Sequence, residues 1–303
     1  MTGSMIATQR STVNSWECDR MGHLNVQFYL ARWSDAIAHL GLKLGFQPSQ
    51  ARARRIALLA AEDRIQFKRE LREGAITTIH ACVRGISDRG LIVHGEMREG
   101  ETGISSAAFD SIITCCDLDD DCEIPLPDEV RARAEAMAGA CDLPPPMPPQ
   151  GGPEAPAGVV AGMYETGRGA VNSWEIDWHG AMAPRFFMAR CSDAAAHLMS
   201  GAGLDPHLMR DRNWGSAALD YRLTYLRRLR AGDAVVIKSG LLEIREKVWR
   251  FCHLMLDSAT GEVVARAEIV ALLFDLATRK SFPFPDDIRA KVESQILADP
   301  GRT

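Results

Sequence analysis

The sequence lacks the features of several large classes of protein. It contains no run of about 18 apolar residues, so it predicts no membrane-spanning helix. No CxxC pair occurs among the eight cysteines, and no His, Cys, Asp or Glu cluster has the spacing of a metal site. A phosphate-binding loop and a dinucleotide fingerprint are also missing. We therefore expect neither a metal nor a cofactor.

An excess of positive charge is missing too. The 303 residues include 35 Lys and Arg against 40 Asp and Glu, which gives a formal charge of −5. This balance predicts no nucleic-acid partner, and we expect no membrane association. The start of the chain, Met1 to Arg10, has no apolar segment, and the cysteines form no obvious pairs. We therefore expect a cytoplasmic protein with reduced thiols.

What the sequence does contain is an internal repeat. The run Val13 to Glu17 recurs as Val171 to Glu175, an offset of 158 residues. From residue 13 to residue 48, half of the positions are identical at that offset, far above chance for this composition. The register then continues without a gap as far as Pro127 and Pro285. The chain is therefore a tandem duplication of one fold.

Seven of the fifteen prolines lie between the two repeats, from Pro144 to Pro156. Proline lacks the amide that helices and sheets need, so this stretch predicts a semi-extended linker. We expect a first domain at residues 1–140, a linker at 141–162 and a second domain at 163–303. A duplication of this size indicates a fused dimer rather than a solenoid.

Each repeat predicts one long buried helix followed by four strands, which is an α+β arrangement. Residues 26–43 have the length of a helix and are apolar around most of its circumference, so this helix must be buried. The second copy predicts a helix at residues 182–200. The expected strands are 6–15, 55–69, 75–86, 90–98 and 104–117, then 216–228, 234–244, 247–257 and 263–275.

The first repeat contains a run that reads Trp-Glu-Cys-Asp-Arg-Met-Gly-His-Leu-Asn-Val-Gln-Phe-Tyr-Leu from residue 16 onward. This run resembles the hotdog-fold thioesterases of the 4-hydroxybenzoyl-CoA thioesterase type. Their pattern is an Asp, a Gly three residues later, often a His and an Asn, and then an aromatic residue on the helix. The resemblance covers each repeat nearly end to end. It implies two tandem hotdog domains, each an antiparallel sheet wrapped around a long central helix, that form a pseudo-dimer.

The resemblance also implies an acyl-CoA thioesterase, which hydrolyses a thioester to free acid and CoA thiol. In the family, a carboxylate at the position of Asp19 acts as nucleophile or general base, and backbone amides near Asn25 and Val26 hold the thioester carbonyl. We therefore expect Asp19, His23 and Asn25 to be catalytic, and Gly22 and Val26 to bind substrate. The amides of a helix N-terminus suit this chemistry, because they stabilise the charge that develops on the carbonyl oxygen.

The second repeat keeps Asp177 and Gly180 as a possible second site. Ala181 and Ala183 replace the His and Asn of the first repeat, and alanine side chains form no hydrogen bonds. We therefore expect two unequal sites, with Asp19 carrying most of the activity.

Simpler structural roles compete with these functional ones. Asp19 and Asn25 are residue types that also cap helices and turns, and His23 could be an ordinary turn histidine. Arg32, Asp35 and His39 fall on one stripe of the helix, which favours an intrahelical polar network.

Two further matched pairs are open to more than one role. Trp16 and Trp174 favour core or interface packing over a ligand platform. Glu62 and Asp220 are matched acidic residues, either solvated at a strand end or second carboxylates of the opposite site.

Two other functions remain open: an acyl-CoA-binding or regulatory hotdog protein without catalysis, and a hotdog enoyl-CoA hydratase. The expected partner is an acyl-CoA molecule. Both halves of the pseudo-dimer lie in one chain, so we expect either a monomer or a further homo-oligomer.

Overall fold

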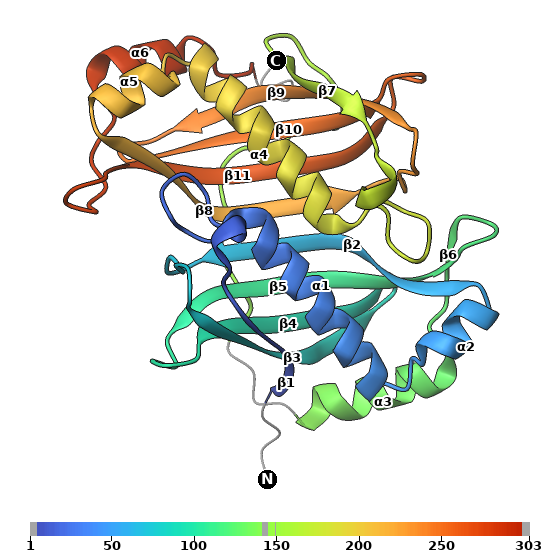
Figure 1. Ribbon diagram of the computed structural model, residues 1–303. Coiled ribbons are helices and arrows are strands. Elements are labelled where there is room, and N and C mark those ends of the chain that lie inside the picture. The colour runs from blue at the N-terminus through green and yellow to red at the C-terminus, as the bar shows by residue number, and fades with distance from the viewer. Residues whose placement is uncertain (1–4, 141–144, 149, 299–303) are drawn as a thin grey trace. The chain divides into compact units, whose positions relative to one another are not determined.

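The computed structural model describes residues 5–140, 145–148 and 150–298, and it divides the chain into two compact units, Met1–Pro148 and Pro149–Thr303. In each unit one long helix lies across an antiparallel sheet (Figure 1). The boundary between the units falls inside the proposed linker 141–162, of which residues 141–144 and 149 lie outside the described residues.

The sheet of the first unit has the strand order β1-β3-β4-β5-β2, and the short β6 pairs with β5. The helix α1 crosses this sheet, with α2 and α3 near one end of it (Figure 1). The elements are β1 (Ile6–Thr12), α1 (Val26–Lys43), α2 (Pro48–Ala53), β2 (Ile56–Phe67), β3 (Ile76–Ser87), β4 (Gly90–Glu99), β5 (Ser105–Asp117), β6 (Cys122–Ile124) and α3 (Asp128–Ala140).

The second unit repeats this topology, with the strand order β7-β9-β10-β11-β8. Its irregularities are repeated too: the register shifts at Ala61 in β2 and at Leu219 in β8, which are 158 residues apart. The elements are β7 (Tyr164–Ala170), α4 (Pro184–Gly201), α5 (Pro206–Asp211), β8 (Trp214–Tyr225), β9 (Ala234–Ile244), β10 (Val248–Asp257), β11 (Val263–Asp275) and α6 (Asp286–Glu293). The predicted α+β fold and its duplication are confirmed.

The two units fill their cores with different side chains. In the first, Trp33 of α1 stacks on Phe109 with ring centroids 4.8 Å apart, and its indole donates to Ser111 Oγ at 2.8 Å. Gly95 makes room for the indole, because a Cβ there would lie 2.3 Å from it. In the second unit the equivalent positions hold Cys191 and His253, so the large side chain comes from the strand instead of the helix.

Burial sets the charge state of that second core. His253 is 1% exposed, and its Nδ1 lies 2.5 Å from Ser239 Oγ. Burial lowers the pKa of His253 to about 3, because an imidazolium would lose its hydration there. The side chain is therefore neutral at physiological pH.

Several local predictions were incomplete or wrong. The helices α2, α3, α5 and α6 and the strands β6 and β7 were not predicted, and α4 begins at Pro184 rather than at residue 182. The expectation that all thiols are reduced is wrong at Cys82, which is disulfide-bonded. Six other cysteines are free, namely Cys18, Cys115, Cys116, Cys122, Cys191 and Cys252.

Two features are missing from the described residues. None of their helices is both long and apolar enough to cross a bilayer. No group of three or more His, Cys, Asp or Glu side chains within the same residues is placed to hold a metal ion.

Candidate active site

The loop before α1 folds into a tight turn around Asp19. The Asp19 amide donates to the carbonyl of His23 at 2.7 Å, and the Gly22 amide donates to the carbonyl of Asp19 at 2.9 Å. Gly22 has a φ of +75°, and a Cβ there would meet nothing within 4 Å. The glycine is therefore needed for the backbone conformation of the turn rather than for close packing.

The carboxylate of Asp19 is held by this turn. Its Oδ1 accepts hydrogen bonds from the amides of Met21 at 2.8 Å and His23 at 3.1 Å. Within the described residues, Oδ2 accepts none. Asp19 thus has the turn role that its residue type favours, and it also keeps one oxygen available in a partly buried position.

Asn25 and Val26 form the N-terminus of α1. Asn25 is the N-cap: its Oδ1 accepts from the Gln27 amide at 3.2 Å, and its own amide donates to the Glu17 carbonyl at 2.9 Å. The next amide, that of Val26, donates no hydrogen bond in the part of the chain that the structure describes. The helix therefore presents one unused N–H at its positive end.

His23 contributes to the loop through both its backbone and its side chain. Its amide binds Asp19, while its imidazole points elsewhere: Nε2 lies 3.2 Å from Glu70 Oε2. The imidazole is buried, and His23 also forms an isolated bridge with Arg72. The structure thus brings Asp19, His23 and Asn25 into one loop, with His23 linked to a glutamate that the sequence analysis did not single out.

The loop before α4 has the same backbone. The Asp177 amide donates to Ala181 at 2.8 Å, the Gly180 amide donates to Asp177 at 2.9 Å, and Gly180 has a φ of +82°. The carboxylate is bonded differently, because Asp177 Oδ2 lies 3.2 Å from His179 Nε2. His179 was missed in the sequence analysis, although it stands two residues after the Asp.

The N-terminus of α4 differs more deeply. Its N-cap is Ala183, which makes no side-chain cap. The first helical residue is Pro184, which has no N–H at all. The amide that Val26 offers in the first unit therefore has no counterpart in the second.

Two structural expectations near this loop are wrong in part. Arg32 donates to the Phe28 carbonyl within its own helix at 3.2 Å, but its Nη2 pairs outside the helix with Glu17 Oε2 at 2.7 Å, and Arg190 pairs in the same way with Glu175. Trp16 and Trp174 do not pack in a core, because they are 76% and 73% exposed, and packing at an interface stays a prediction. In addition, Asp220 is not solvated, since it is buried and accepts from Gln150 Nε2 at 2.8 Å.

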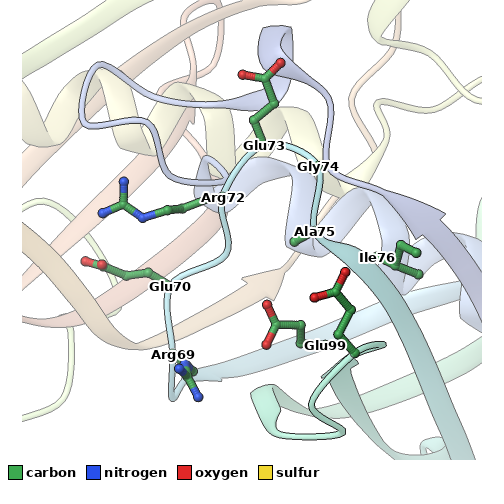
Figure 2. A pocket seen from close by; sticks show the side chains of 9 residues that line it. Arg69, Glu70, Arg72, Glu73, Gly74, Ala75, Ile76 and Glu99 are labelled. Carbon is green, nitrogen blue, oxygen red and sulfur yellow. The ribbon is translucent and has the colours of Figure 1, made fainter.

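A cavity of about 590 Å³ lies beside this loop in the first unit. Figure 2 shows Glu70 and Arg72 extending to one side of the β2–β3 connection, with Glu99 at the end of β4. Arg69, Glu73 and Glu101 also line the cavity, so its lining includes two arginines and four glutamates. An aliphatic chain would gain few apolar contacts in this cavity, and the excess of carboxylates disfavours the phosphates of CoA.

Comparisons with known proteins place the chain in a family. Residues 13–148 and 171–292, one stretch in each unit, match the model of the thioesterase-like superfamily. The betainyl-CoA thioesterase of Pseudomonas aeruginosa is 29% identical over 122 residues, which is 40% of this chain and 77% of that protein. The L-carnitine dehydrogenase/betainyl-CoA thioesterase of Rhizobium meliloti is 26% identical over 123 residues, which is 41% of this chain but 25% of that longer protein.

A solved structure extends the likeness to both units. The 12:0-ACP thioesterase from Umbellularia californica aligns with a TM-score of 0.67, covering 88% of this chain and 93% of that one. At 12% identity this similarity concerns the fold alone. With the family model matched once in each unit, the chain belongs to the thioesterase-like superfamily and is built as two tandem hotdog units.

Proposed function

We propose that the chain is an acyl-CoA thioesterase whose main site is the loop and helix N-terminus of the first unit. The observation that supports this proposal is the presence of two groups in one loop. Asp19 has a carboxylate oxygen that accepts no hydrogen bond among the described residues, and the Val26 amide donates none there. Six residues of the same loop, 20–25, lie between them, and the helix begins directly after the N-cap.

The chemistry follows from those two groups. Asp19 either attacks the thioester carbonyl carbon itself or takes a proton from a water molecule that attacks it. In both routes the carbonyl oxygen gains negative charge, and the Val26 N–H donates to it. The carbon–sulfur bond then breaks, and the CoA thiolate leaves and is protonated. When Asp19 is the nucleophile, water then hydrolyses the acyl anhydride formed on its carboxylate, which releases the free acid and restores Asp19. The Met21 and His23 amides hold Asp19 in one orientation, which limits the entropy lost on reaction.

The remaining site residues have supporting roles in this proposal. Gly22 allows the turn and leaves its outer side open to substrate. Asn25 caps the helix and so fixes the direction of the Val26 amide. His23 acts through its amide on Asp19, and its imidazole joins the loop to Glu70.

CoA is favoured over acyl-carrier protein as the carrier of the thioester because both sequence relatives are named as betainyl-CoA thioesterases. We also propose that residues 141–162 are the linker between the two domains, 1–140 and 163–303. The two units in one chain then need no second chain to supply a hotdog partner.

The test is release of free thiol from a panel of acyl-CoAs of different chain length and charge, with binding of each measured in parallel by calorimetry. Release from at least one of them, abolished by Asp19→Asn, is expected. Binding without release would instead indicate a regulatory acyl-CoA-binding protein. Addition of water across a C=C bond of an enoyl-CoA, detected by loss of its ultraviolet absorbance, would indicate a hydratase.

A further inference from the structure

Glu17 holds the loop before α1 through both its side-chain carboxylate and its backbone carbonyl. Its side-chain Oε2 accepts from the Asn14 amide at 2.8 Å, Asn14 Nδ2 at 3.1 Å and Arg32 Nη2 at 2.7 Å. Its backbone carbonyl accepts from the amide of Asn25. One residue therefore connects the start of the loop to the N-cap of α1.

Arg32 extends this connection to the strand β1. It is buried, and besides Glu17 it donates to Ser11 Oγ at 2.8 Å and to the Thr12 carbonyl at 3.0 Å. The ion pair with Glu17 is almost shielded from water, with side chains 5% and 12% exposed. Burial alone would raise the pKa of Glu17, but the hydrogen bonds from Arg32 and Asn14 outweigh it and lower the pKa below its ordinary value. Glu17 is thus a fixed anion at neutral pH.

The position of this pair in the chain links it to the reaction. Asp19 follows Glu17 by two residues, and Val26 follows Asn25 directly. The separation between the Asp19 carboxylate and the Val26 amide therefore depends on the two anchors of Glu17. We propose that Glu17 is a positioning residue for thioester hydrolysis: it sets that separation without touching the substrate. This role rests on the function proposed above.

The second unit supplies a matched control. Glu175 Oε2 accepts from the Asn172 amide at 2.6 Å, Asn172 Nδ2 at 3.1 Å and Arg190 Nη2 at 2.7 Å. Its carbonyl accepts from the Ala183 amide at 2.8 Å. The framework is the same, but Pro184 leaves it with no amide at the first helical position, where the first unit has that of Val26. Losing the carboxylate should therefore cost similar stability in both units and activity in only one.

The experiment compares Glu17→Gln with Glu175→Gln in the full chain. Glu17→Gln should lower kcat by about tenfold or more and change KM by no more than about twofold, because a displaced catalytic group slows chemistry without weakening binding. Glu175→Gln should leave kcat within about twofold of wild type. Thermal unfolding should shift by similar amounts in both variants.

A second pair of variants separates positioning from stability. Glu17→Leu combined with Arg32→Met replaces both buried partners with apolar side chains of similar size, so stability should return toward that of wild type, as it should for Glu175→Leu with Arg190→Met. The kcat of the first double variant should stay low, because a leucine cannot accept the hydrogen bonds from Asn14. Equal kcat losses in the two single variants, or recovery of kcat in the double variant, would overturn the positioning role.

The outcomes also distinguish this role from the proposed function. A wild-type chain that releases no thiol from any acyl-CoA would contradict the function, and the positioning role would fall with it. An active wild type that is silenced by Asp19→Asn but keeps its kcat in Glu17→Gln would overturn the positioning role alone.

Discussion

The loops before α1 and α4 share a backbone and differ in the groups they present. Both have the Asp–Gly turn with a left-handed glycine and the buried Glu–Arg pair. Only the first has a capping Asn and an amide at the first helical position; the second has Ala183 and Pro184. The shared features are those that build the loop, and the differing ones are those that the proposed reaction uses.

This difference shows what duplication preserves. The turn and the ion pair persist in both copies, where they hold the loop in the same backbone conformation. A cap and a free amide are dispensable for folding: proline is even favoured at the first helical position. The second unit can therefore keep its fold while presenting different chemistry.

The change with the largest expected effect gives α1 of the first unit the proline that begins α4 of the second unit. Val26→Pro removes the N–H that would bind the oxyanion, and kcat should fall by about 100- to 1,000-fold. The fold should tolerate it, because Asn25 already has φ −64° and ψ 142°, close to the values of Ala183 before Pro184. Circular dichroism should show wild-type helix content. An unchanged kcat would mean that the oxyanion is bound elsewhere.

A second contrast concerns buried charge. Arg250 in β10 donates to the Pro153 carbonyl at 2.7 Å and lies 3.5 Å from Glu268, whereas the equivalent position in the first unit is Ile92. Arg250→Met should cost up to about 3 kcal/mol of unfolding free energy, because the partly buried Glu268 would lose its cation and the Pro153 carbonyl its donor. Urea denaturation measures this cost. Adding Glu268→Leu should recover most of it, and a cost below about 1 kcal/mol would argue against a buried pair.

The cores should respond differently to acid. The pKa of His253 is lowered from 6.5 to about 3 by burial, so the unfolded chain binds a proton there before the folded one does. As pH falls from 6.5 toward 3, the folded state should lose about 1.4 kcal/mol per pH unit from this group. The matched position in the first unit is Gly95, which cannot titrate. Denaturation of wild type and His253→Gln across this range should show a shallower slope in the variant; parallel slopes would contradict the burial effect.

The smallest expected effect concerns the helix caps. Asn25→Ala should lower stability by about 1 kcal/mol, the usual cost of a lost N-cap. Ala183→Asn should raise it by a similar or smaller amount, since it restores the missing cap. Thermal unfolding of the two variants measures both. If Asn25→Ala reduced kcat as much as Asp19→Asn does, Asn25 would have a direct catalytic role beyond capping.

The duplication and the central helix were predictable because they depend on local pattern. Residues 26–43 are apolar around most of the predicted helix, and the structure places α1 at these residues. The two repeats align without a gap, so the sequence predicted the same topology in both units. The helix α3 was missed although Pro127 and two acidic residues mark its start, because it has no clear apolar face. A helix of that kind is stabilised by the surface on which it docks, which the sequence does not show.

The site was predictable in part for the same reason. Asp19, His23 and Asn25 lie within seven residues, so one loop had to bring them together. Glu70, which contacts His23, lies far along the chain, so only the fold reveals this contact. Arg32 was assigned to a polar stripe of the helix, and its pairing with Glu17 is also visible only in the fold. The exposure of Trp16 and Trp174 was also hidden, because a large aromatic residue ordinarily predicts burial.

The most direct test of the account is a side-by-side measurement of kcat for Asp19→Asn and Asp177→Asn on the same acyl-CoA. Asp19→Asn should lower kcat by about 100-fold or more, because it removes the group that we propose to attack the carbonyl or to activate water. Asp177→Asn should cost far less, since Pro184 provides no amide at the first position of α4. Both variants should remain folded by circular dichroism. Equal losses, or a larger loss for Asp177→Asn, would contradict the assignment of the main site to the first unit.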